Sequence, residues 1–161
     1  MDIKRLREVL SYAPDTGKLT WKVRVANRVH VGDEAGYPNS VGYRALELDG
    51  KSYLAHRVAW ALGHGQVPIK DIDHADGDRC NNALCNLRLV THNENLQNQR
   101  KAMRNNRTGL LGVSLDNRSG HYQARIRLDG KSTALGTFTT AEAAHAAYVK
   151  AKRIMHPAGT L

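Results

Sequence analysis

A short stretch of the chain combines residues that could hydrolyse a phosphodiester bond. Asp73 and His74 are adjacent, a loop rich in Asn follows, and Asn86 and Asn95 lie further along the chain. Such hydrolysis needs a base that deprotonates water and a cation that stabilises charge on the phosphate and the leaving oxygen. A histidine titrates near neutrality and suits the first role. Asp and Asn oxygens suit a hard cation such as Mg²⁺, which keeps positions open for water and phosphate.

Two strands and a helix must position these residues. The pattern predicts a strand that ends near Asp73 and His74, a second short strand over residues 87–90, and a helix that carries Asn95. Because neighbours on a regular strand point to opposite faces, Asp73 and His74 can share a site only if the strand ends or twists there. The Asp76-Gly77 turn signal that follows directly favours such an end.

Two other interpretations of this stretch stay open. Asn and Asp commonly satisfy the backbone of turns, and this structural interpretation is preferred for Asp76, Asn81 and Asn82. Cys80 and Cys85 could supply half of a zinc site, with His74 or His92 recruited to it. Two reduced thiols are the preferred interpretation, because no second cysteine pair completes a zinc site.

The elements upstream of this stretch are a mixture of helices and strands. Helical spacing of apolar residues predicts a helix over residues 2–12 with Asp2 as its N-cap, and a strand follows over residues 19–25. Asp49-Gly50 is a strong hairpin signal inside residues 43–54. A second helix is expected over residues 55–62, ending at the glycines that follow.

Positive charge is concentrated in the last third of the chain. The whole sequence carries a net charge of +9, and residues 99–161 hold 11 Lys and Arg against 3 Asp and Glu. Residues 1–98 are nearly neutral, with 13 against 12. This asymmetry suits a polyanion, and nucleic acid is the usual one inside a cell. A merely solvated basic surface is the alternative.

The C-terminal third is predicted to be a three-stranded sheet with one helix. Strands are expected over residues 111–116, 122–128 and 132–138, with an Asp129-Gly130 turn, and a helix starts at a Thr139-x-x-Glu142 capping box and runs to about Met155. The second strand alternates cleanly. Its apolar residues would pack on the helix, whereas Gln123, Arg125 and Arg127 would form an exposed face that could enter the DNA major groove.

The stretch from Ile72 to Asn98 resembles the His-Asn-His (HNH) endonucleases, and in particular their phage and intron-homing branch. The resemblance rests on D-H, N-x-x-N-L-R and E-N in that order, and it extends upstream through T-G-K-L-T-W, G-Y-R and L-A-H-R-V-A-W. It implies that Asp73 and Asn95 are metal ligands and that His74 is the general base. Asn86 would hold the loop and orient His74. His56 is interpreted as structural or as a phosphate contact.

The last third resembles the AP2 DNA-binding domain through G-V-S, A-R-I-R, L-G-T-F and A-x-x-A-Y. This domain also occurs fused to phage endonucleases. The resemblance implies that Ser114, Arg125 and Arg127 contact DNA. Leu111 stands where the plant pattern has Arg, so base preference does not carry over. Further candidate DNA contacts are Gln123, Arg118, Lys131, Arg104 and Arg107.

Together these features predict an α+β protein in two parts. An HNH endonuclease domain would occupy residues 1–98, with a ββα-metal core over about 68–98, followed by a basic linker (99–108) and an AP2-like domain (109–161). The expected activity is hydrolysis of duplex DNA with Mg²⁺, or Mn²⁺ as the alternative, by a monomer that nicks or a homodimer.

The rival functions are a non-catalytic DNA-binding regulator and an RNA-binding or RNA-cutting protein. The second lacks the aromatic platform of single-strand readers. No apolar run approaches the ~20 residues that cross a bilayer, and the N-terminus lacks the apolar stretch of a secretory signal. We therefore expect no membrane partner and a soluble protein in the cytoplasm of a bacterial host, encoded by a phage or prophage.

Overall fold

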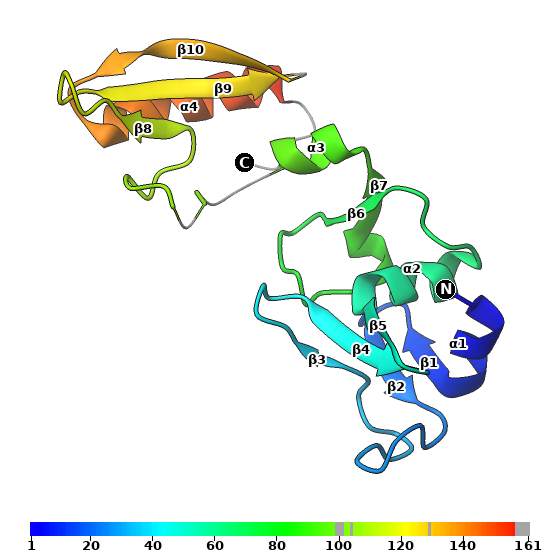
Figure 1. The fold of residues 1–161 in the computed structure, drawn as a ribbon. Coiled ribbons are helices and arrows are strands. Elements are labelled where there is room, and N and C mark those ends of the chain that lie inside the picture. The colour runs from blue at the N-terminus through cyan, green and yellow to red at the C-terminus, as the bar shows by residue number, and fades with distance from the viewer. Residues whose placement is uncertain (99–101, 104, 129, 157–161) are drawn as a thin grey trace. The chain divides into compact units, whose positions relative to one another are not determined.

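The computed structural model describes residues 1–98, 102, 103, 105–128 and 130–156, and these form two compact units (Figure 1). The units divide between Thr91 and His92. Residues 99–101 and 104 of the predicted linker and Asp129 of the predicted turn lie outside the described residues. The predicted domain boundaries at 98 and 109 stay predictions. No helix in the described part of the chain is long and apolar enough to span a membrane.

The first part of this unit consists of two small antiparallel sheets and two helices that pack against each other. Strands β1 and β2 form one sheet, and β4 lies between β3 and β5 in another. Helix α2 contacts both β4 and β5. These elements are α1 (Ile3–Val9), β1 (Leu10–Ala13), β2 (Lys18–Trp21), β3 (Tyr37–Pro38), β4 (Arg44–Leu48), β5 (Lys51–Leu54) and α2 (Ala55–His64).

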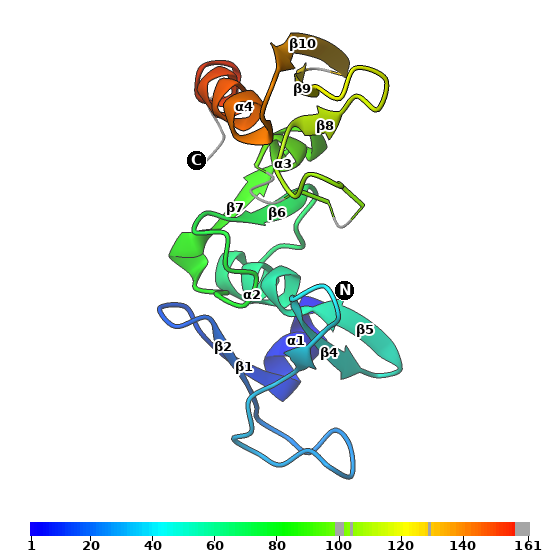
Figure 2. The same ribbon diagram turned by 90° about the vertical axis from the view of Figure 1, so that its left-hand side faces the viewer.

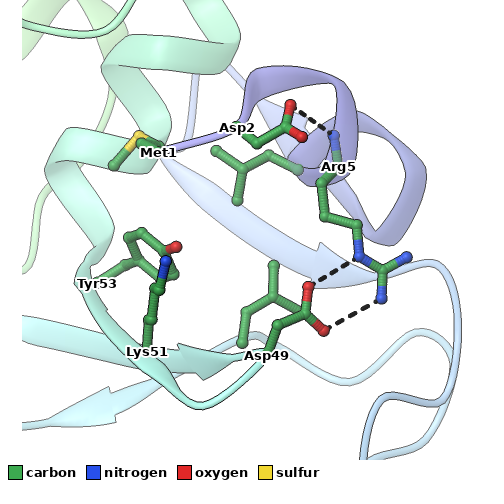
Figure 3. A pocket seen from close by; sticks show the side chains of 8 residues that line it. Met1, Asp2, Arg5, Asp49, Lys51 and Tyr53 are labelled. Atoms are coloured by element: carbon green, nitrogen blue, oxygen red, sulfur yellow. Dashed lines mark hydrogen bonds and ion pairs between the residues drawn. The ribbon is translucent and has the colours of Figure 1, made fainter.

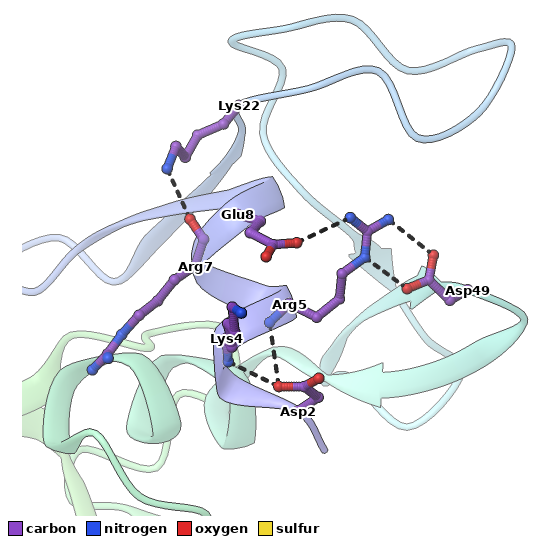
Figure 4. Close-up of polar contacts among 7 residues, drawn as sticks. All are labelled: Asp2, Lys4, Arg5, Arg7, Glu8, Lys22 and Asp49. Atoms are coloured by element: carbon purple, nitrogen blue, oxygen red, sulfur yellow. Dashed lines mark hydrogen bonds and ion pairs between the residues drawn. The ribbon is translucent and has the colours of Figure 1, made fainter.

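The first helix is shorter than its apolar pattern indicates. The side chain of Asp2 caps it as predicted, accepting hydrogen bonds from the backbone N–H groups of Lys4 and Arg5 (Figure 4). The helix ends at Val9 rather than near Tyr12, because the next residues pair with β2 as strand β1. That second strand ends at Trp21, short of the predicted Val25.

The predicted Asp49-Gly50 hairpin is confirmed. Both residues have positive φ, 49° and 72°, as the tight hairpin turn between β4 and β5 requires. Arg5 of α1 binds the Asp49 carboxylate through Nε at 2.9 Å and Nη2 at 3.2 Å, which ties the turn to the first helix (Figure 4). Helix α2 continues to His64, two residues beyond the predicted end, and Gly65 caps it in the left-handed conformation.

The first unit ends in another antiparallel hairpin. Strand β6 (Asp71–His74) pairs with β7 (Leu87–Val90), the range predicted for the second strand. A long loop connects them and closes with the short 3₁₀ helix η1 (Leu84–Asn86). Ile72 and Leu87 pack with Ala59 and Trp60 of α2, so the hairpin is anchored to that helix by apolar contact.

The second unit holds one short helix and the predicted three-stranded sheet with a long helix on one face (Figure 1). Strand β9 is central, and Ala124 and Ile126 are buried on the side toward α4. The elements are α3 (His92–Gln97), β8 (Val113–Leu115), β9 (Tyr122–Leu128), β10 (Lys131–Phe138) and α4 (Ala141–Met155). Figure 2 shows α4 nearly end-on, beside the sheet.

Two local features of this unit differ from or refine the expectation. The N-cap of α4 is Thr140, whose hydroxyl accepts from Ala143 N, and not the predicted Thr139. Gly112 of the G-V-S motif has φ 76°, and a side chain there would collide with the ring of Tyr148. The chain just before β8 packs so closely against α4 that this position requires glycine.

Candidate active site

The β6–β7 hairpin places an acidic and a basic side chain opposite each other. Asp73 pairs with Arg88 in the antiparallel register, and residues directly opposite have neighbouring side chains. Arg88 donates to Oδ2 of Asp73 from Nε at 2.8 Å and from Nη2 at 2.7 Å. Both side chains are largely covered, which strengthens the ion pair relative to one on the open surface. The hairpin thus presents a carboxylate whose charge is balanced across the strands.

His74 is the last residue of β6, so the strand does end at the predicted point. Its side chain is buried with 4% of its surface exposed, and its Nε2 lies 3.2 Å from Oδ1 of Asn82. An amide oxygen only accepts hydrogen bonds, so Nε2 carries the proton in this arrangement. The lone pair then resides on Nδ1, which is the nitrogen able to take a proton from water.

Two further rings surround His74. The ring of His56 on α2 stands edge-on to it, with centroids 5.2 Å apart and an interplanar angle of 86°. The ring of Tyr43, just before β4, lies 5.9 Å from His74 and 5.1 Å from His56. The guanidinium of Arg79 lies over the Tyr43 ring, 4.9 Å from its centroid. Arg79 also donates to the backbone oxygen of Val41 at 2.7 Å. A cation is therefore fixed close to the histidine pair.

His56 is buried without a full set of hydrogen bonds. It exposes 5% of its surface, and Nδ1 has no partner among the described residues. Burial lowers the pKa of His56 to about 4, and the nearby His74 and Arg57 lower it in the same direction. His56 is consequently neutral at physiological pH.

Asn86 holds the loop that follows β6. Its side chain accepts from Asp76 N at 3.0 Å and donates to Asp76 Oδ1 at 3.0 Å and Asn81 O at 2.8 Å. Burial tends to raise the pKa of Asp76, but hydrogen bonds from Asn81, Asp78 N and Asn86 outweigh this and keep it below its usual value. The His74 ring donates its hydrogen bond to Oδ1 of Asn82 and not to Asn86.

The β1–β2 hairpin contacts the same loop. The Tyr12 hydroxyl donates to Asn82 O at 2.9 Å, and Leu84 N donates to Pro14 O at 2.8 Å. Gly17 has φ 74°, and a side chain there would overlap the backbone of Asn82 and Ala83. The conformation of the residue that holds His74 thus depends on a turn far upstream in the sequence.

The other predicted site residues of this stretch lie as follows. Asn95 is half-buried on α3, which belongs to the second unit, and His92 is exposed at the start of that helix. Cys80 and Cys85 are free and exposed, and the Cys80 thiol donates to Gly42 O at 3.4 Å. Among the described residues no group of three His, Cys, Asp or Glu side chains could hold a metal ion.

The predicted DNA-contacting face of the second unit is exposed. Arg125 and Arg127 project from β9 on the side away from α4, while Gln123 is half-buried. Ser114 lies opposite Gln123 and Ser132 opposite Arg127, so the serines share this face. Arg107, Arg118 and Lys131 are exposed as well, and Arg104 lies outside the described residues.

A surface cavity of about 330 Å³ lies elsewhere in the first unit, between α1 and the β4–β5 turn (Figure 3). Asp2, Arg5, Asp49 and Lys51 contribute its polar lining. Arg5 and Asp49 bind each other across it, and Asp2 caps α1. Because Arg5, Asp49 and Asp2 already have structural partners, the cavity does not compete with the His74 cluster as a candidate site.

Asn82, Tyr43, Arg79 and Arg88 are the members of the site that the sequence did not single out individually. Asn82 had been interpreted as a turn residue, as had its neighbour Asn81. Tyr43 and Arg88 fall inside the G-Y-R and N-L-R motifs, which provided the one available signal for them. Nothing in the spacing indicated that Arg79 would lie on Tyr43.

Comparisons with known proteins cover the part of the chain that contains this candidate site. Residues 53–97, which run from within β5 to the end of α3, match the family model described as HNH endonuclease, and the chain belongs to that family. Protein 3.8 of Escherichia phage T7 is 35% identical over 82 residues, which cover 50% of this chain and 67% of the phage protein. A solved structure of DNA binding and cleavage by the HNH homing endonuclease I-HmuI matches 62% of this chain and 56% of its own, with 26% identity and a TM-score of 0.43. The family assignment rests on the first two comparisons.

Proposed function

We propose that this protein is a metal-dependent endonuclease that hydrolyses phosphodiester bonds in duplex DNA. The observation that carries the proposal is His74 at the end of β6, with Nε2 bonded to Asn82 and Nδ1 left as the basic nitrogen. The HNH endonuclease match spans this histidine together with Asp73, Asn86 and Asn95. The family and the local geometry therefore support the same residue as the base.

His74 takes the role of general base. Nδ1 accepts a proton from the attacking water while the bond from Nε2 to Asn82 holds the ring in place. Asn86 acts indirectly, by fixing the loop that carries Asn82. Arg79, fixed on Tyr43 beside the histidines, is placed to contact a phosphate oxygen.

The donor atoms fit a hard divalent cation. Asp73 and Asn95 are the proposed ligands on the basis of the family resemblance, and both offer oxygen. Arg88 donates two hydrogen bonds to Oδ2 of Asp73 and so orients its carboxylate. Mg²⁺ commonly keeps several waters and needs few protein ligands, so two suffice; Mn²⁺ is the alternative. A bound cation would supply stabilisation of the charge on the phosphate and the leaving oxygen.

The second unit is proposed to bind the DNA and to position the nuclease on it. Its exposed β9 face carries two arginines, and it belongs to the part of the chain that holds nearly all of the excess positive charge. An AP2-like sheet that enters the major groove accounts for both features. One site per chain predicts nicking by a monomer, and cutting both strands would need a dimer or two successive nicks.

Cleavage of a supercoiled plasmid tests the catalytic proposal. We expect relaxation or linearisation with Mg²⁺, none with EDTA, and a rate reduced by at least about 100-fold in His74→Ala. The matched control is His64→Ala, which removes an exposed histidine stacked on Trp60 of α2 and leaves the His74 cluster intact. DNA affinity of each variant is measured in parallel, so that lost binding is not read as lost chemistry.

Either result is decisive. Metal-dependent cleavage that His74→Ala abolishes and His64→Ala retains would establish the nuclease and its base. Tight, salt-sensitive duplex binding without cleavage under any divalent metal would instead assign the chain to the non-catalytic DNA-binding proteins. Preferential binding to RNA would favour the RNA-directed alternative.

A further inference from the structure

We infer that His56 is a positioning residue for the general base, because its ring fixes the ring of His74. The inference rests on the proposed function of His74 and adds a second histidine to the site. Three observations carry it. The two rings meet edge to face, His56 is almost fully buried, and its Nδ1 lacks a hydrogen-bond partner among the described residues.

The packing of the core does not by itself require a histidine here. An unpaired polar atom in the interior destabilises a fold, whereas an apolar side chain of similar size would fill the space without that cost. The neighbouring buried residues of α2, Ala55, Val58 and Ala59, follow the apolar pattern. The imidazole of His56 is therefore the exception on this helix face, and it lies against the proposed catalytic base.

The contact restricts how His74 can rotate. Its ring is bounded by His56 at 5.2 Å, by Tyr43 at 5.9 Å, and by the Asn82 amide at Nε2. If His56 is removed, one of these boundaries is lost and the ring gains rotational freedom about its side-chain bonds. The bond from Nε2 to Asn82 then no longer persists, and Nδ1 does not stay in a single orientation.

The neutrality of His56 matters for the same step. When His74 takes a proton it becomes a cation, and a second cation at this distance would oppose that change. His56 avoids this because it is buried and because it is the second residue of α2, where the positive end of the helix dipole disfavours a charged imidazole. The neighbour of the base is thus a ring that constrains it without repelling its protonated form.

The test compares His56→Ala, His56→Phe and the control His64→Ala in the full chain. The first readout is ¹⁵N NMR of His74 in the free protein, which distinguishes a single Nε2–H tautomer from a mixture. The second is single-turnover cleavage set against DNA affinity. We expect His56→Ala to mix the tautomers and to lower the cleavage rate about 10- to 100-fold at unchanged affinity. His56→Phe keeps a ring and is expected to restore most of the fixed tautomer, and His64→Ala changes neither readout.

The outcomes separate this inference from the proposed function. A folded His56→Ala protein with an unchanged His74 tautomer and an unchanged cleavage rate would overturn the role of His56 while leaving the nuclease intact. If His56→Ala fails to fold, His56→Phe decides: a mixed tautomer or mobile His74 ring in that variant contradicts positioning by the ring. If the unmodified protein cleaves nothing, the proposed function fails, and the tautomer measurement still reports on the contact between the histidines.

Discussion

His56 makes the stability of the first unit sensitive to acid. Its pKa is about 4 in the folded protein because of burial and nearby charge, against about 6.5 for an ordinary histidine. Between these values the unfolded chain binds a proton that the folded chain does not, so unfolding becomes easier as the pH falls. We expect the free energy of unfolding to drop by as much as about 3 kcal/mol between pH 6.5 and pH 4 from this group alone.

Denaturant melts at several pH values measure this effect. The slope of stability against pH over that window should be shallower in His56→Phe than in the unmodified chain, since phenylalanine does not titrate. His64→Ala serves as the control and should keep the slope. Identical slopes in His56→Phe and the parent would show that His56 titrates normally in the folded state.

Asn82 illustrates which residue roles the sequence conceals. The end of the strand near Asp73 and His74 followed from the Asp76-Gly77 turn signal, and β6 does end at His74. Asn82 looked like an ordinary turn residue because its partner is the ring of His74, eight positions earlier in the sequence. Only the closure of the β6–β7 hairpin brings the two together, and no local pattern encodes that distance.

Strand β9 is the element on which DNA binding by the second unit should depend. Arg125 and Arg127 face away from α4, and removing both should weaken duplex binding and reduce the salt dependence by roughly one phosphate contact each. If either reads a guanine edge, its loss should also relax sequence preference by about 1–3 kcal/mol. Titrations with labelled duplex at several salt concentrations give both quantities.

Arg153 on α4 offers a control that removes the same charge as either single β9 variant, Arg125→Ala or Arg127→Ala. It is exposed, and its helix packs on the opposite side of the sheet from the β9 arginines. Arg153→Ala should therefore leave affinity nearly unchanged, apart from the general effect of one lost charge. Equal losses from Arg153→Ala and from the β9 variants would indicate diffuse attraction to a basic surface and not a binding face.

At the level of elements, the sequence predicted alternating patterns better than ends. The alternation of β9 was correct because burial on one face imposes a period of two along a strand. The end of α1 was wrong because Leu10 fits a helical stripe and an inward strand position equally well. Leu10 is in a strand because it pairs with Trp21, and helix periodicity does not report that contact.

At the scale of the whole molecule, the proposed catalytic residues and the excess positive charge lie in different parts of the chain. Residues 1–98 contain the proposed base and metal ligands yet are close to neutral, whereas residues 99–161 hold the excess of Lys and Arg. A protein ending at Asn98 should bind duplex DNA far more weakly than the full chain, and its binding should depend much less on salt. Its intrinsic cleavage rate at saturating DNA should fall much less than its affinity. Gel-shift titrations and single-turnover cleavage test this split, and equal binding by the truncated protein would count against it.

Contacts between the β1–β2 hairpin and residues 82–84, made by Tyr12, Pro14 and Gly17, limit how this protein can be divided. The family match begins at residue 53, but these supports come from the β1–β2 hairpin far upstream. A transplant of residues 53–97 into another scaffold would carry the proposed site residues. It would leave behind the β1–β2 hairpin, which contacts the loop at residues 82–84. The β1–β2 hairpin and residues 53–97 should therefore be inherited together and kept together in engineered proteins. A substitution at Gly17 should have the same effect as a substitution in the candidate active site.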